Sequence, residues 1–130
     1  MKVLITGANG FVGKNLIAHL QERKDVEVLR FCREDDIGSL HSLVSTADFI
    51  FHLAGVNRPQ NIEEFKTGNA DFTQLLCAAV AASGRNIPLL YTSSIQAEFD
   101  NAYGSSKREA EDALLNLSEQ YGNDVHLFRL

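Results

Sequence analysis

Short apolar runs alternate with longer amphipathic stretches along this chain. Most of the short runs are continuously apolar, which is typical of strands covered on both faces in a parallel sheet. The pattern predicts strands at residues 2–6, 26–31, 49–53, 88–92 and 125–130. It predicts helices at residues 11–23, 36–45, 62–83 and 103–121. This alternation indicates an α/β fold, a doubly wound parallel sheet of about five strands with right-handed crossovers.

Composition supports one compact domain and excludes several classes of protein. The chain has 130 residues, 45% hydrophobic and 22% charged, so it can bury a core and is not a disordered tail. A net charge of −5 without a basic block argues against a nucleic-acid partner. No apolar run is long enough to span a membrane, and we expect no signal peptide. Cys32 and Cys77 predict two free thiols, no metal site and a cytoplasmic location.

The most informative stretch leads from the first strand into the first helix, through glycines at a spacing of three. Gly7 permits a tight turn, Gly10 lets a ligand approach the backbone, and Gly13 lets the helix pack close to the strand. Unpaired N–H groups at the start of the helix would then bind a pyrophosphate. We also expect Phe11 and Val12 on the inner side of this helix. The residues predicted to hold a dinucleotide here are Gly7, Asn9, Gly10, Phe11, Val12 and Gly13.

The GxxGxxG spacing in this strand–turn–helix context resembles the extended short-chain dehydrogenase/reductase family. The resemblance implies a Rossmann-like domain that binds a nicotinamide dinucleotide. Leu53, Ala54 and Gly55, after the third predicted strand, resemble the family segment that lies beneath the cofactor. His52, directly before them, is interpreted as a packed histidine rather than a catalyst.

The residues after the second strand bear on the choice between NADP and NAD. NAD-binding proteins usually carry an acid here to hold the ribose 2′-hydroxyl. Arg30 and Arg33 bracket this position instead, and an arginine suits a 2′-phosphate. We therefore expect NADP rather than NAD, with Arg33 as its ligand. Glu34, Asp35 and Asp36 follow, and one of them could serve the hydroxyl instead.

A second group of residues ends the fourth predicted strand and begins the last helix. Tyr103 and Lys107 are four residues apart, so they meet on one helix face. An ammonium beside a phenol favours phenolate, which can exchange a proton with a substrate as hydride moves. Ser94 would hold the substrate oxygen, with Ser93 as the competing choice and Thr92 as a more distant one. These residues match the family's Ser–Tyr–Lys set, which implies that Tyr103 and Lys107 also contact the cofactor.

One polar residue interrupts the apolar face of the third predicted helix. Phe65, Asn69, Phe72, Leu76 and Ala79 share this face through steps of four and three. A buried amide needs hydrogen-bond partners. An asparagine in the matching family helix supports the active site, which implies an orienting role for Asn69 among the catalytic residues. The alternative is a core amide bonded only to backbone.

Residues 52–59, 93–97 and 100–104 are similar to a narrower branch of the family, the capsular polysaccharide biosynthesis reductases. Enzymes of that branch use NADPH to reduce the 4-keto group of a UDP-activated deoxy sugar on the way to N-acetyl-L-fucosamine. The resemblance therefore implies a nucleotide-sugar substrate. It also implies that Arg58 contacts the substrate or the cofactor; the alternative is that Arg58 is an ordinary surface arginine. Family members commonly dimerise through their long helices, so a homodimer is a further expectation.

The predicted sheet ends at the last residues of the chain, which leaves a shelf for a cofactor but little wall for a second substrate. We therefore expect residues 1–130 to form an NAD(P)-binding domain truncated at its C-terminus, a piece of a longer enzyme. The similar reductases continue through a substrate-binding region and a cupin domain.

Other functions stay open from the sequence. A sugar-nucleotide epimerase uses the same triad, and a dinucleotide sensor keeps the fold without the chemistry. A dehydratase is disfavoured because no acid follows Ser94 until Glu98.

Overall fold

The computed structural model describes residues 1–56 and 59–130. Within them, five parallel strands form one sheet in the order β2-β1-β3-β4-β5. The strands are β1 (Lys2–Thr6), β2 (Glu27–Phe31), β3 (Phe49–His52), β4 (Leu89–Ser93) and β5 (Val125–Arg129). The α-helices are α1 (Phe11–Leu20), α2 (Gly38–Thr46), α3 (Glu63–Phe65), α4 (Phe72–Ser83) and α5 (Ala102–Tyr121). A π-helical segment, η1 (Lys66–Asp71), joins α3 to α4, and a 3₁₀ turn, η2 (Ile95–Glu98), follows β4.

The predicted α/β fold is confirmed, and the elements differ from the prediction mainly at their ends. The third predicted helix is not uniform, because η1 widens it between α3 and α4. The first helix ends before its predicted limit: beyond Leu20 the chain forms tighter turns, with Glu22 N donating to His19 O and Arg23 N to Leu20 O.

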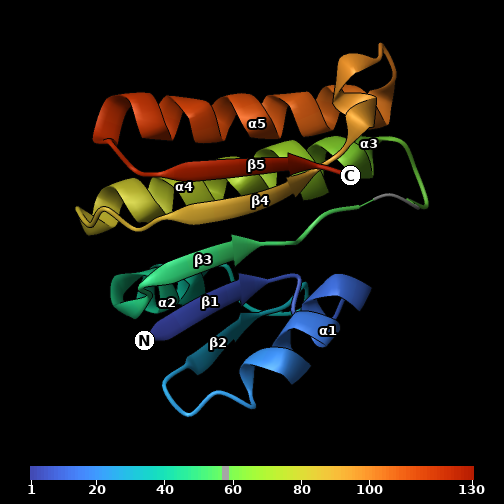
Figure 1. The fold of residues 1–130 in the computed structure, drawn as a ribbon. Coiled ribbons are helices and arrows are strands. Elements are labelled where there is room, and N and C mark those ends of the chain that lie inside the picture. The colour runs from blue at the N-terminus through green and yellow to red at the C-terminus, as the bar shows by residue number, and fades with distance from the viewer. Residues whose placement is uncertain (57–58) are drawn as a thin grey trace.

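Strand order creates the place where a ligand can bind. Because β1 pairs with both β2 and β3, the chain reverses its direction across the sheet after β2. Right-handed crossovers then place α1 on one face and α2, α4 and α5 on the other (Figure 1). Ligands of open α/β sheets bind at such a switch point, outside the carboxyl ends of the strands.

Two apolar layers hold the helices to the sheet. Leu4, Ile50 and Leu89 are fully buried beneath α2, α4 and α5, whereas Val3 and Ile5 pack toward α1. Alternate residues of a strand point to opposite faces, so both faces need apolar side chains. This requirement explains the continuous apolar runs.

The first turn of α1 departs from the prediction. Phe11 and Val12 were expected on the inner side, but they are 84% and 48% exposed. The buried stripe of α1 consists of Gly13 and Ile17. At 3.6 residues per turn, Phe11 lies on the far side of the helix from Gly13.

Both cysteines are free thiols, as predicted; Cys77 is buried and Cys32 half-buried. None of the helices in the described part of the chain combines the length and apolarity that a membrane crossing requires.

Candidate functional site

The glycine turn adopts the close-packed geometry that its spacing predicts. Gly7 has a φ of +72°, and a Cβ on it would lie 2.7 Å from the backbone nitrogen of Ala54. A Cβ on Gly13 would overlap the carbonyl oxygen of Gly7. Gly10 caps α1 without a side-chain hydrogen bond, so no described side chain occupies the N–H groups of the first turn. The start of α1 is therefore available to an anionic group.

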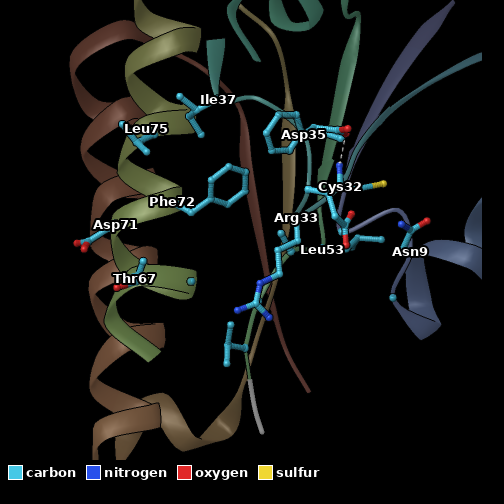
Figure 2. A pocket seen from close by; sticks show the side chains of 18 of the residues that line it. Asn9, Cys32, Arg33, Asp35, Ile37, Leu53, Thr67, Asp71, Phe72 and Leu75 are labelled. Atoms are coloured by element: carbon cyan, nitrogen blue, oxygen red, sulfur yellow. Dashed lines mark hydrogen bonds between the residues drawn. The ribbon is translucent and has the colours of Figure 1, made fainter. Parts of the chain in front are cut away.

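A cavity of about 470 Å³ opens at the carboxyl ends of β1, β2 and β3 (Figure 2). This volume is within the range of cofactor pockets. The predicted cofactor residues that line it are Gly7, Asn9, Gly10, Arg33, Leu53, Ala54 and Gly55. Phe11, Val12 and Gly13 do not line it. The wall facing Asn9 and Leu53 in Figure 2 comes from Ile37, Phe72 and Leu75, none of which the sequence predicted to line a cofactor site.

The residues after β2 take different roles around this cavity. Arg33 is exposed and extends along the cavity (Figure 2). Asp35 accepts a hydrogen bond from Cys32 N (2.7 Å), and Asp36 accepts one from Gly38 N (3.3 Å) at the start of α2. Asp36 does not line the cavity but Asp35 does, so Arg33, Glu34 and Asp35 are the charged residues after β2 that could meet a ribose.

Helix α5 brings Tyr103 and Lys107 together at the end of β4. Lys107 is only 6% exposed, and its Nζ donates to the carbonyl oxygen of Thr92 (3.1 Å). The same Nζ lies 4.9 Å from the ring centroid of Tyr91 and 6.0 Å from that of Tyr103. Burial lowers the pKa of Lys107 to about 8, and the charge of Glu111 opposes that shift. Lys107 thus stays mainly protonated at neutral pH.

The three hydroxyls at the end of β4 are not equivalent. The Ser93 hydroxyl is buried and donates to Glu111 Oε2 (2.5 Å), because odd-numbered residues of β4 face α5. Ser94 is the N-cap of η2, and its Oγ accepts a hydrogen bond from Gln96 N (3.1 Å). Thr92 contributes its carbonyl oxygen to Lys107. The engagement of Ser93 favours Ser94 for a contact with substrate.

Asn69 connects the loop after β3 to helix α5. Its side chain is fully buried in η1. Oδ1 accepts from Val56 N (2.9 Å), and Nδ2 donates to Val56 O (3.1 Å) and Ser106 Oγ (3.0 Å). Ser106 in turn donates to the carbonyl oxygen of Tyr103 (2.7 Å). The amide therefore bonds to more than backbone, and it reaches the helix that carries Tyr103.

Gly55 is the point where the cavity and the Tyr103–Lys107 pair adjoin. It lines the cavity, and a Cβ on it would lie 3.2 Å from Lys107 Nζ. Ser94, Tyr103 and Lys107 themselves do not line the cavity. The site is therefore elongated, with the cavity at one end and the hydroxyl and ammonium groups at the other.

Two features of the site escaped the sequence argument. A Cβ on Gly104 would overlap the carbonyl oxygen of Gln96, so this glycine lets α5 approach the segment after Ser94. A glycine directly after Tyr103, inside a predicted helix, was the feature of the sequence that could have indicated this close approach. Ser106 gave no signal, because its importance depends on which helix faces meet. Arg58 lies outside the described residues.

Known proteins are similar to this chain in sequence and in fold. Residues 3–130 match the NAD dependent epimerase/dehydratase family. The chain is 62% identical, over its whole length, to the UDP-2-acetamido-2,6-beta-L-arabino-hexul-4-ose reductase of Pseudomonas aeruginosa. It is 30% identical over 86% of its length to the ceramide reductase of Caulobacter vibrioides. It covers 35% of the first relative and 41% of the second, so it spans well under half of either protein.

Solved structures agree with the sequence matches. The capsular polysaccharide assembling protein CapF from Staphylococcus aureus superposes with a TM-score of 0.85 at 42% identity, over 99% of this chain and 35% of that protein. The UDP-glucuronic acid 4-epimerase of Bacillus cereus, solved with NAD, superposes with a TM-score of 0.86 over 99% of this chain and 56% of that one. Its identity of 18% shows a shared fold alone. The glycine turn, the Rossmann-like sheet and the family match over residues 3–130 together show that the chain belongs to the NAD dependent epimerase/dehydratase family.

Proposed function

We propose that this chain is the NAD(P)-binding part of a cytoplasmic reductase that uses NADPH to reduce a UDP-activated 4-keto deoxy sugar for a capsular or other surface polysaccharide. The observation that carries the proposal is the buried Lys107 beside Tyr103, next to the cavity of about 470 Å³. The 62% identity to the Pseudomonas aeruginosa reductase supports the choice of substrate. Because the chain covers 35% of that protein, the complete activity is part of the proposal.

The residues fit a nicotinamide dinucleotide along the edge of the sheet. The free N–H groups at the start of α1 suit its pyrophosphate, and Ala54 and Gly55 leave room for it above β3. Arg33 would bind the 2′-phosphate of NADP as a charged fork. Asp36 lies outside the cavity lining and one oxygen of Asp35 is held by Cys32 N, while Arg33 is the cationic residue of the lining, which supports NADP over NAD.

Tyr103, Ser94 and Lys107 would divide the acid–base work. NADPH, when bound, would supply the hydride that reduces the carbonyl carbon. The Tyr103 phenol gives its proton to the developing alkoxide, so the ketone becomes an alcohol, while the Ser94 hydroxyl holds the same oxygen. The Lys107 ammonium stabilises the phenolate left behind and offers hydrogen bonds to the nicotinamide ribose. Asn69 would orient α5 through Ser106.

The test is NADPH oxidation by the full-length protein that carries this chain. We expect addition of a UDP-linked 2-acetamido-2,6-dideoxy-4-keto sugar to consume NADPH in step with the alcohol formed. The same sugar with a hydroxyl at C4 is the control and should consume none. Interconversion of sugars with a cofactor that survives purification would indicate an epimerase. Dinucleotide binding without turnover of any ketosugar would indicate a sensor and contradict the proposal.

A further inference from the structure

His52 is fully buried at the end of β3, and both of its ring nitrogens are engaged. Nδ1 lies 2.7 Å from Thr6 Oγ1, and Nε2 lies 2.8 Å from Thr73 Oγ1. The ring stacks on Tyr91, with centroids 5.0 Å apart and an interplanar angle of 23°. This arrangement confirms a packed histidine, yet its two partners belong to different parts of the site.

The neighbouring groups fix the direction of each hydrogen bond. Thr73 Oγ1 lies 2.6 Å from the carbonyl oxygen of Asn69, which can only accept, so the Thr73 hydroxyl donates there. Thr73 must then accept from His52, which places the ring proton on Nε2. Nδ1 is left as an acceptor, and the Thr6 hydroxyl donates to it. Thr6 Oγ1 in turn accepts from Ala54 N (3.2 Å).

The result is a chain of hydrogen bonds that runs in one direction, from Ala54 N–H through Thr6, His52 and Thr73 to the Asn69 carbonyl. Each donor in this chain has an acceptor. A neutral imidazole is the side chain that offers a donor and an acceptor on opposite edges of one rigid plane. Burial, aided by the charge of Lys107, lowers the pKa of His52 to about 3, so the neutral ring persists at physiological pH.

The hydrogen-bond chain has two arms, one from His52 to Thr6 and one from His52 to Thr73, and they lead to different ends of the elongated site. The Thr6 arm joins the ends of β1 and β3 beneath the cavity, where Ala54 forms part of the wall. The Thr73 arm holds the backbone of Asn69, whose side chain bonds to Ser106 on α5.

We propose that His52 is a positioning residue. Its Nδ1 edge, through Thr6, fixes the position of Ala54 in the wall of the dinucleotide site, and its Nε2 edge, through Thr73 and Asn69, fixes the position of the helix that carries the proton donor. The proposal rests on the proposed reductase function only for its turnover measurement; the binding and exchange measurements stand apart from it.

Two amide substitutions in the full-length protein separate the arms. His52→Asn keeps an acceptor near the Nδ1 position and loses the bond to Thr73, whereas His52→Gln keeps a donor near the Nε2 position and loses the bond to Thr6. We expect His52→Asn to lower kcat roughly tenfold with the NADPH Kd within about threefold of the unmodified protein. We expect His52→Gln to raise the NADPH Kd roughly tenfold, with kcat at saturating NADPH within about threefold.

Amide hydrogen exchange supplies a readout that does not require turnover. His52→Asn should speed exchange at residues 102–107, and His52→Gln should leave it unchanged there. Thr73→Val should reproduce the His52→Asn pattern, while Thr73→Ser, which keeps the hydroxyl, should match the unmodified protein.

The outcomes are distinct. Equal losses of binding, turnover and protection in both His52 variants, or no change in either, would overturn the positioning role. If the unmodified enzyme reduces no ketosugar, the proposed function fails, and the dissociation constants and exchange rates still decide the role of His52.

Discussion

At the residue scale, the proposed preference for NADP over NAD rests on the charged groups after β2. Arg33 is exposed on the cavity, while Asp35 and Asp36 are held by backbone N–H groups. We therefore propose that a preference for NADP over NAD depends on the Arg33 guanidinium, which has no fixed carboxylate partner in the part of the chain that the structure describes. A 2′-phosphate would complete its hydrogen bonding, and a 2′-hydroxyl would not.

We predict that Arg33→Ser raises the Kd for NADPH by roughly tenfold to a hundredfold, because a charge-assisted hydrogen bond is lost. The Kd for NADH should change less than about threefold, as titration calorimetry can measure. Arg30→Ser is the matched control, since Arg30 lies exposed on β2 and does not line the cavity. Equal weakening of both dinucleotides by Arg33→Ser would contradict the assignment.

Gly104 is a second residue whose replacement should have a defined cost. A Cβ there would overlap the carbonyl oxygen of Gln96 and lie 2.8 Å from that of Phe99, so α5 would have to move away from η2. We predict that Gly104→Ala lowers the free energy of unfolding by about 1–3 kcal/mol, measured by urea denaturation. Gly38→Ala, where the nearest atom is a flexible Asp36 oxygen at 3.4 Å, should change it by less than about 0.5 kcal/mol. A stable Gly104→Ala protein would show that the helix has room to shift.

Single residues were predictable where their chemistry is local. The glycine turn and the Tyr103–Lys107 pair each follow from spacing within one short stretch of sequence, and the structure brings each group together as expected. Contacts such as Asn69 with Ser106 join residues of different elements. Their existence depends on how the helices pack, which no local pattern contains.

At the element scale, α5 is attached to the sheet by more than apolar contacts. Glu111, one turn after Lys107, is 4% exposed and accepts from Arg129 Nε (2.9 Å) and Nη2 (2.8 Å) at the end of β5. It also accepts from Ser93 at the end of β4. Burial alone would raise the pKa of Glu111, but the hydrogen bonds from Arg129 and Ser93 outweigh it and hold the pKa low. One carboxylate thus joins three elements.

We predict that Glu111→Gln lowers the free energy of unfolding by about 2 kcal/mol, below the usual cost of breaking a buried pair because Arg129 is partly exposed. The matched control is Asp71→Asn, which removes the exposed pair with Lys66 and should cost less than about 0.5 kcal/mol. Chemical denaturation at neutral pH measures both. Equal costs for the two substitutions would mean that the Glu111 network adds no stability.

Strand β3 should give the protein a specific sensitivity to acid. The pKa of His52 is about 3 in the folded chain and about 6.5 in an unfolded one. As pH falls from about 6.5 to 3, the unfolded chain binds a proton that the folded chain refuses, so the unfolding free energy decreases. His52→Asn should flatten this decrease by up to about 1.4 kcal/mol per pH unit, measured by urea denaturation across the range. Parallel pH profiles for the two proteins would show that His52 does not contribute.

The sequence predicted the strands and the main helices, but it predicted neither η2 nor η1. The π-helical segment lies where Gly68 packs against Val56, so closely that a Cβ on Gly68 would overlap the Val56 side chain. The widened turn therefore coincides with a contact to the loop after β3. Apolar spacing along residues 62–83 is compatible with a uniform helix, so it could not reveal this turn.

At the scale of the whole molecule, the sheet presents one continuous edge with two unequal ends. The cavity of about 470 Å³ encloses one end, while Ser94, Tyr103 and Lys107 lie outside its lining. The chain spans 35% of the Pseudomonas aeruginosa reductase. The glycine turn and strand pattern predicted this edge, whereas the shape of the cavity depends on Ile37, Phe72 and Leu75, which only the fold brings together.

We predict that residues 1–130 alone bind NADPH more weakly than the full-length protein and reduce no ketosugar at a measurable rate. The enclosed half of the site suits the adenosine part of the cofactor, whereas Ser94, Tyr103 and Lys107 do not line this cavity. Calorimetry and an NADPH oxidation assay on both proteins measure the difference. Full activity of the isolated chain would show that these residues suffice.

The most direct test of the account is the turnover of Tyr103→Phe in the full-length protein, compared with Tyr121→Phe. Tyr121 ends the same helix and is 55% exposed, so its substitution should leave kcat unchanged. We predict that Tyr103→Phe lowers kcat for NADPH-dependent ketosugar reduction by about 10²–10⁴-fold, while the NADPH Kd stays within about threefold. An undiminished kcat in Tyr103→Phe would contradict the assignment of proton transfer to this residue.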